Sequence, residues 1–219
     1  MREKPIIFST EMVKKLLNGE KTQTRRVVKI PSWTWDKHDD LKLENGELLA
    51  HSRKKGYAMP INQPYAVGDV LWVRETCASF EGAMGAGYIY KADEVHNPPI
   101  ENCIPDRWKP AIHMPREAAR ILLHITSVRA ERLQKISSTD MWAEGCLPQD
   151  INQDEVGTHG EWLEKYWIPL WDSLNAARGY GWEKNPWVWV VEFEVVQPLK
   201  NAVKKPHEEA AQNGLEYAT

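Results

Sequence analysis

The sequence holds few of the residues that build disulfide scaffolds or metal centres. Among its 219 residues are three cysteines, Cys77, Cys103 and Cys146, and no two of them form a CxxC pair. An odd count without such a pair argues against a disulfide framework. No HxxxH or HExxH spacing is present either. We therefore expect neither a bound metal nor another cofactor.

Long apolar runs and glycine-rich phosphate loops are missing as well. No stretch approaches the roughly 18 apolar residues of a membrane span, and the first residues, MREKPIIFSTEM, lack the apolar core of a signal peptide. Together with the cysteine usage, this predicts a cytoplasmic protein that does not contact membranes. The patterns GxxxxGK[ST] and GxGxxG do not occur, which disfavours enzymes of nucleoside triphosphates and dinucleotides.

An excess of positive charge is also absent. Lys and Arg number 28 against 31 Asp and Glu, so the formal net charge is −3. Proteins that bind duplex DNA gain much of their affinity from contacts between basic residues and phosphates. We therefore expect no duplex DNA as a partner, although the balance leaves room for a small basic pocket.

Tryptophan is the abundant residue, with 11 Trp against 3 Phe. A Trp side chain buries a large apolar area, so we expect most of them in the core and one or two to stack on a base or sugar. A hydrophobic content of 42% and a charged content of 27% are typical of a globular protein. The length fits one large domain, which we place at residues 1–197, followed by an exposed polar tail at 198–219.

The hydrophobic pattern predicts strands that are interleaved with a few helices. The predicted strands are 5–9, 21–28, 70–75, 87–91, 120–130 and 187–195, and the predicted helices are 10–17, 138–144 and 160–177. Pro169 predicts a kink or break in the last helix. Residues 32–64 and 94–118 read as two long irregular insertions. Because βαβ alternation is absent, the fold class is α+β with a mainly antiparallel, barrel-like sheet of five to six strands and about three helices.

The segment GEKTQTRR at residues 19–26 concentrates hydrogen-bond donors directly after a helix stop. One interpretation is a solvated edge strand whose basic side chains prevent pairing with another strand. The other is a site for an anion or a polar ligand. On a flat strand, Lys21 and Thr24 point to opposite faces. Their cooperation therefore requires the turn at Gly19 to swing Lys21 around.

This segment, the strand GDVLWVRET and the closing strand WVWVVEFEV resemble the ASCH family, whose fold is a PUA-like β-barrel. The longer stretches FSTEMVKKLLNGEKTQTRR, KPAIHMPREAARILLHITSV and NPWVWVVEFEVV are similar to ASCH-containing proteins of bacteriophages and prophages. The resemblance runs from about Pro5 to Val196, and it implies a PUA-like barrel that carries the two insertions.

One bacterial branch of the family hydrolyses N4-acetylcytidine with a Lys, a Thr and a Glu. The pattern GxKTxTxR carries the first two onto Lys21 and Thr24, and the Glu falls on Glu144 in Trp-Ala-Glu-Gly. The resemblance thus implies an amidohydrolase in which Lys21 takes the proton of Thr24, the Thr24 hydroxyl attacks the acyl carbonyl, and Glu144 protonates the leaving amine. Arg25 and Arg26 would bind substrate and lower the pKa of Lys21. For Glu144, a solvent-facing position on a helix is the alternative.

Three further residues are candidates for substrate binding. Trp72 could stack on a base at the barrel mouth, with Arg74 at its polar edge, and His113 could reach the site from extended chain. Each also has a structural alternative: a core tryptophan, an arginine paired with a carboxylate, and a histidine with satisfied hydrogen bonds.

Two other functions stay open beside the amidohydrolase. One is a module that binds RNA or a modified base without catalysis, and the other is an ASCH-type ribonuclease. The predicted partner is accordingly a small modified nucleoside or a short RNA, and the sequence makes no prediction of the oligomeric state.

Overall fold

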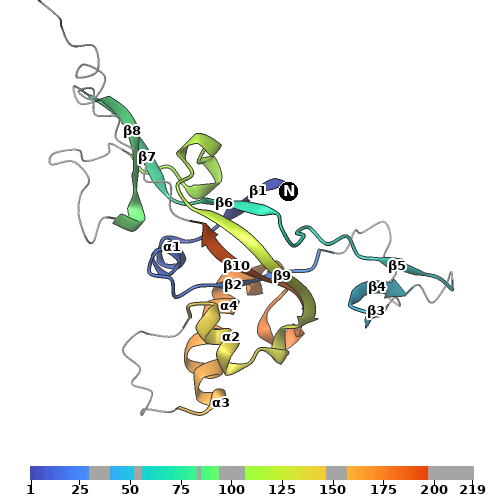
Figure 1. Cartoon of the computed structure of the whole chain (residues 1–219). Coiled ribbons are helices and arrows are strands. Elements are labelled where there is room, and N and C mark those ends of the chain that lie inside the picture. The colour runs from blue at the N-terminus through green and yellow to red at the C-terminus, as the bar shows by residue number, and fades with distance from the viewer. Residues whose placement is uncertain (30–39, 52–55, 83–84, 94–106, 147–156, 197–219) are drawn as a thin grey trace, which may run out of the picture. The chain divides into compact units, whose positions relative to one another are not determined.

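The computed structural model describes residues 1–29, 40–51, 56–82, 85–93, 107–146 and 157–196 (Figure 1). The predicted tail and parts of both predicted insertions, with Cys103, lie outside these ranges. The chain divides into two compact units. The first unit comprises residues 1–2, 18–70 and 124–194, and the second comprises residues 3–17, 71–123 and 195–219.

The sheet of the first unit contains β9 (Leu122–Arg132), β10 (Trp187–Val196) and β2 (Gln23–Val27), in this order (Figure 1). β10 pairs with β2 in antiparallel register, with Val191 opposite Thr24. Residues 188–191 are all buried, so the first half of this strand is covered on both faces.

Three short helices accompany this sheet: α2 (Ser138–Ala143), α3 (His159–Trp162) and α4 (Ile168–Asn175). α2 begins at a capping box in which Ser137 and Asp140 each bond the other's backbone N–H. Between α3 and α4, residues Leu163–Trp167 form a π-helical turn. Pro169 has no N–H to donate to the preceding turn. The predicted kink or break therefore takes the form of this π-helical turn, and the backbone stays helical from α3 through it into α4.

The hydrophobic core of the first unit gathers residues from these helices and from β10. It contains Leu133, Ile136, Met141, Trp167, Trp171, Val188 and Val190. Trp167 and Trp171 belong to this core, and Trp189 is buried too. The other described tryptophans are half-buried or exposed, so the prediction that most tryptophans lie in the core is wrong for the described residues. This core packs Met141 of α2 against Val188 and Val190 of β10, and the candidate site depends on both elements.

The prediction of an irregular chain from 32 to 64 is wrong for its described part. Three strands, β3 (Asp40–Glu44), β4 (Glu47–His51) and β5 (Ala58–Pro60), form a small antiparallel sheet. Asn45 and Gly46 join the first two with φ angles of 50° and 82°. Two successive positive φ angles are typical of the tight hairpin turn that Asn-Gly favours, so the sequence held this signal.

The second unit contains β1 (Glu3–Ile7) next to β6 (Val70–Arg74), the helix α1 (Thr10–Leu17), and a hairpin of β7 (Cys77–Gly82) and β8 (Gly85–Tyr90). β7 was not predicted, because its sequence CASFEG has no run of apolar residues. Short 3-10 turns at Ala111–His113 and Arg116–Ala118 occupy the described part of the second predicted insertion.

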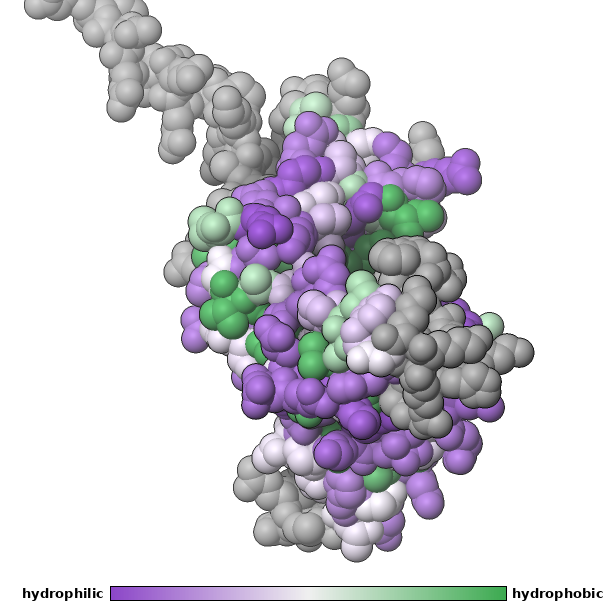
Figure 2. Space-filling view, turned by 90° about the vertical axis from the view of Figure 1, so that its right-hand side faces the viewer, coloured by the Kyte–Doolittle hydropathy of each residue, from purple (hydrophilic) through white to green (hydrophobic). Residues whose placement is uncertain are grey.

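The α+β class and the mainly antiparallel pairing are confirmed. Within the described ranges there are ten strands rather than five or six, since β3–β5 and β7 add to the predicted set. These strands form open sheets and no closed barrel. On the face shown in Figure 2, hydrophobic residues appear only as small separate patches among hydrophilic ones. No helix in the described residues is both long and apolar enough to cross a membrane.

Candidate functional site

The centre of the candidate site is a buried contact between Lys21 and Glu144. The Lys21 Nζ donates a hydrogen bond to Glu144 Oε2 at 2.9 Å and another to the Glu144 backbone carbonyl at 2.7 Å. The two side chains are 2% and 6% exposed. The resemblance places both residues in one site without predicting a contact between them. The alternative of a solvent-facing Glu144 is wrong, because the residue is buried.

Backbone hydrogen bonds bring the two residues together. The Thr22 N–H donates to the Ala143 carbonyl at 2.9 Å, which ties the start of β2 to the end of α2. The Phe193 N–H donates to the Thr22 carbonyl at 2.9 Å, which extends the pairing with β10. Glu144 is the C-cap residue of α2, so the Lys21 ammonium also satisfies a carbonyl at the helix end, where a cation is favoured.

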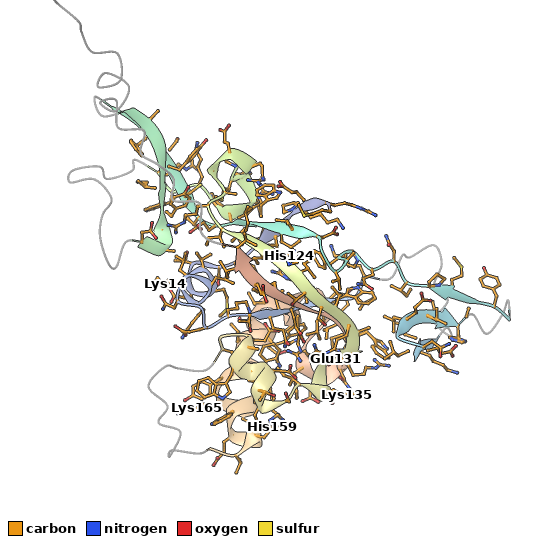
Figure 3. All side chains as sticks on the ribbon, in the orientation of Figure 1. Lys14, His124, Glu131, Lys135, His159 and Lys165 are labelled. Carbon is orange, nitrogen blue, oxygen red and sulfur yellow. The ribbon has the colours of Figure 1, made fainter. Side chains whose placement is uncertain are left out.

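Arg25 holds the other oxygen of the same carboxylate. Its Nη1 lies 3.2 Å from Glu144 Oε1, and its Nη2 lies 2.6 Å from Glu131 and 3.1 Å from Asp140. Its side chain is fully buried. Figure 3 labels Glu131 on β9, the strand that brings this carboxylate to Arg25. A buried guanidinium thus faces three carboxylates, an arrangement that a planar fork of donors suits.

A second layer of polar groups surrounds these contacts. The Gln23 amide donates to Asp140 at 3.1 Å. The Arg129 guanidinium bonds Asp140 at 3.1 Å and Glu131 at 3.4 Å, and it also pairs with Glu192. Since Arg129 is 37% exposed, the cluster runs from the surface to the buried Lys21.

Strand alternation explains which residues of GEKTQTRR meet these acids. Lys21, Gln23 and Arg25 are two residues apart, share one face, and all bond side chains or carbonyls of residues 131–144. Strand alternation places Thr24 on the opposite face. It is 4% exposed, and within the described ranges its hydroxyl makes no hydrogen bond, to Lys21 or to any other group. The structure thus joins Lys21 to Glu144 and does not join it to Thr24.

Arg26 is two residues after Thr24, so strand alternation places both on the face opposite Lys21. Burial lowers the pKa of its guanidinium, while Tyr65 and Glu144 act in the opposite direction. Arg26 in turn lowers the pKa of Lys21. The predicted influence of this arginine on Lys21 is therefore present.

Burial sets the protonation of the residues around the ion pair. It lowers the pKa of Lys21, against the opposing charge of Glu144. Burial also raises the pKa of the neighbouring Cys146 thiol, to about 12. Burial raises the pKa of Asp140 too, but hydrogen bonds from Ser137 and the charge of Arg25 outweigh it, and the value falls to about 2. The site therefore contains a lysine that loses its proton more readily than usual and a firmly ionised aspartate.

The other predicted binding residues belong to the second unit. The Arg74 guanidinium lies over the Trp72 ring at 5.5 Å and donates to the carbonyls of Ile112 and Met114. His113, between them, is exposed. Arg74 is thus held by backbone carbonyls and an aromatic ring rather than by the carboxylate that its structural alternative assumed.

Four residues of the cluster were not predicted to belong to a site: Arg129, Glu131, Asp140 and Glu192. Asp140 falls within the predicted helix 138–144. A partial signal for Arg129 and Glu131 was present, since three charged residues, at positions 129, 131 and 132, gather at the end of β9. Within the described part of the chain, no group of three His, Cys, Asp or Glu side chains could hold a metal ion.

The chain is similar to two solved structures. One is an ASCH domain from Lactobacillus crispatus JV V101, with 13% identity and a TM-score of 0.39; the match covers 89% of this chain and 79% of that one. The other is a protein from Enterococcus faecalis V583 of the family DUF984, with 12% identity and a TM-score of 0.42; the match covers 100% of this chain and 86% of that one. No protein-family model and no curated protein matches the sequence.

Proposed function

We propose that this protein is an amidohydrolase that removes the acyl group from an N4-acylated cytidine or a related modified nucleoside. Thr24 is the nucleophile, Lys21 is the base and Glu144 is the acid and base for the leaving amine and the water. The observation that carries the proposal is the buried contact of 2.9 Å between Lys21 and Glu144. The roles themselves come from the resemblance of GEKTQTRR and Trp-Ala-Glu-Gly to the family motif.

The ion pair holds one proton that can move between its two members. Transfer from Lys21 Nζ to Glu144 Oε2 produces a neutral amine and a carboxylic acid, without any change in net charge. These are the two protonation states that acylation requires. Burial favours this transfer, because both charges are removed from water.

The acylation step then balances as follows. Neutral Lys21 takes the proton of the Thr24 hydroxyl while the oxygen bonds to the acyl carbon. Because no hydrogen bond joins these two groups within the described part of the free protein, this step requires that substrate binding bring the hydroxyl to Lys21 Nζ. When the C–N bond breaks, the proton of Glu144 goes to the leaving N4, and cytidine departs with an intact amino group. An acyl ester remains on Thr24.

Deacylation returns each proton to its origin. The Glu144 carboxylate takes a proton from water as the water oxygen bonds to the acyl carbon. The Thr24 oxygen leaves and receives the proton of Lys21. The carboxylic acid product departs, and proton transfer back from Glu144 to Lys21 restores the ion pair.

The test is chromatography of N4-acetylcytidine after incubation with the purified protein. We expect the wild type to release cytidine, and the variants Lys21→Ala, Thr24→Ala and Glu144→Ala to release none. Lys14 and Glu11 provide a matched control, since they also form a Lys–Glu ion pair, at 3.0 Å, but an exposed one. Lys14→Ala and Glu11→Ala should therefore leave the rate unchanged. If folded wild-type protein releases no cytidine even at a high protein concentration, the proposal is refuted.

A second candidate function is binding of RNA or a modified base without catalysis. The observation in its favour lies in the second unit, where the guanidinium groups of Arg74 and Arg116 lie 5.5 and 5.8 Å from the centre of the Trp72 ring. Aromatic rings flanked by cations bind unpaired bases. Two results would favour this function: the protein is retained on an oligonucleotide resin less strongly as the salt concentration rises, and it does not hydrolyse N4-acetylcytidine.

A further inference from the structure

We propose that Arg25 is a positioning residue of this site: its guanidinium fixes the Glu144 carboxylate so that one oxygen is presented to Lys21, and Glu131 and Asp140 fix the guanidinium. The inference rests on the function proposed above, in which Lys21 and Glu144 are the base and the acid. Arg25 does not touch the reacting atoms in this account, and it acts through Glu144.

The first argument is the division of the carboxylate. Glu144 Oε1 accepts from Arg25 Nη1 at 3.2 Å, and Oε2 accepts from Lys21 Nζ at 2.9 Å. With both oxygens engaged by different donors, rotation of the carboxylate breaks at least one hydrogen bond. The guanidinium therefore sets which oxygen faces the lysine and in which direction.

The second argument is that Arg25 itself has little freedom. Its Nη2 is held by Glu131 from β9 at 2.6 Å and by Asp140 from α2 at 3.1 Å. The two acids come from different elements, so the guanidinium plane is anchored independently of Glu144. A lysine at this position would supply the charge without the fork.

The third argument is electrostatic. Glu144 faces two cations, so Arg25 takes up part of the negative charge that would otherwise hold the proton on Lys21. The other titratable or charged groups that act on Lys21 are Arg26, which lowers its pKa, and Cys146, which raises it. Loss of the Arg25 charge should therefore raise the pKa of Lys21. Loss of the Glu131 charge should lower it, because Arg25 is then freer to neutralise Glu144.

These opposite signs define the first experiment, an NMR titration of the Lys21 side chain in lysine-labelled protein. The resonance is assigned by its absence in Lys21→Arg. We expect Arg25→Gln to raise the titration midpoint by about one pH unit, a typical effect of a nearby charge, and Glu131→Gln to lower it. Arg132→Gln is the matched control, since Arg132 is a partly buried arginine that stacks on Trp187 at 4.8 Å. Midpoints that stay fixed, or move in the same direction in both variants, would overturn the proposal.

The second experiment covers the case in which Arg25→Gln does not fold. Arg25→Lys keeps the positive charge and loses the fork, so the midpoint of Lys21 should stay near that of the wild type. If Arg25 positions Glu144, the kcat for N4-acetylcytidine should nevertheless fall by about 10-fold or more, with KM little changed. Full activity of a folded Arg25→Lys variant would contradict the positioning role.

The two proposals fail in different ways. If the wild type releases no cytidine, the amidohydrolase function is refuted, and the titrations of Glu131→Gln and Arg25→Gln still decide whether Arg25 controls the ion pair. If the wild type hydrolyses the substrate while neither variant shifts Lys21, the function stands and the role of Arg25 is refuted.

Discussion

Lys21 donates two hydrogen bonds to one residue, Glu144, which lies 123 positions later in the chain. The 2.7 Å contact goes to the backbone carbonyl at the end of α2, and the 2.9 Å contact goes to the side-chain carboxylate. The same ammonium thus completes a helix end and neutralises a buried acid. Because both tasks fall on one side chain, stability and the proposed chemistry are coupled at this point.

The stability losses on removing the two members of this pair should not be additive. Glu144→Gln leaves the buried Lys21 ammonium without a carboxylate, which typically costs about 3–5 kcal/mol. Lys21→Met should cost less, because Glu144 still faces Arg25 at 3.2 Å. In the double variant Lys21→Met/Glu144→Leu neither charge remains, so its free energy of unfolding should fall by less than the sum of the single effects. Urea denaturation at pH 7 measures all three. Additive losses would contradict a direct interaction between the two residues.

Much of this arrangement follows from local sequence rules. The Ser137 cap places the start of α2, and strand alternation puts Lys21, Gln23 and Arg25 on one face. The resemblance to the family motif supplied the link to Glu144, which no local rule contains. Alternation also predicts that Lys21 and Thr24 lie on opposite faces, and within the described residues no hydrogen bond joins the two side chains.

The acidic partners of Arg25 could not be predicted in the same way. Glu131 and Asp140 lie 106 and 115 positions after Arg25, on a strand and on a helix whose relative placement depends on the whole core. Long-range ion pairs leave no periodic signal in a sequence. The hairpin at Asn45 and Gly46 is a different case, because its turn signal was present and outweighed by the polar residues around it.

The Thr24 hydroxyl should be required for hydrolysis and dispensable for stability. Thr24→Val keeps the shape of the side chain and removes the nucleophile, so release of cytidine should fall by at least about 10²-fold. Thr24→Ser keeps a hydroxyl and should retain measurable activity. Both variants should unfold within about 1 kcal/mol of the wild type, because the hydroxyl makes no hydrogen bond within the described part of the chain. An active Thr24→Val variant would exclude Thr24 as the nucleophile.

Asp140 should make stability fall with acid. Its pKa is lowered from an ordinary 3.8 to about 2, so the folded protein binds fewer protons at this residue than the unfolded chain does between these values. Its stabilising contribution is therefore complete above about pH 4 and is lost as the pH falls towards 2. In Asp140→Asn, melting temperatures should be lower than in the wild type at pH 7 and should approach it at pH 2. A constant difference across this range would show that the carboxylate charge is not responsible.

Substitution of Gly19, two residues before Lys21, should lower the free energy of unfolding only because of its backbone conformation. Its φ angle is +76°, and no atom lies within 4 Å of the position that a Cβ would occupy. Gly19→Ala should therefore lower the free energy of unfolding by about 1–2 kcal/mol, the cost of a left-handed conformation for a residue with a Cβ. Gly19→Asn should cost less, because asparagine tolerates this region.

Gly160 provides the opposite control. It lies in α3, where φ is not positive, and an added Cβ would meet only the Thr158 hydroxyl, at 3.9 Å. Gly160→Ala should therefore raise the free energy of unfolding by about 0.4–1 kcal/mol, because it restricts the unfolded chain without strain in the folded one. Urea denaturation of the three variants tests both signs. If Gly19→Ala were as stable as the wild type, the turn that delivers Lys21 to Glu144 would not depend on a left-handed residue.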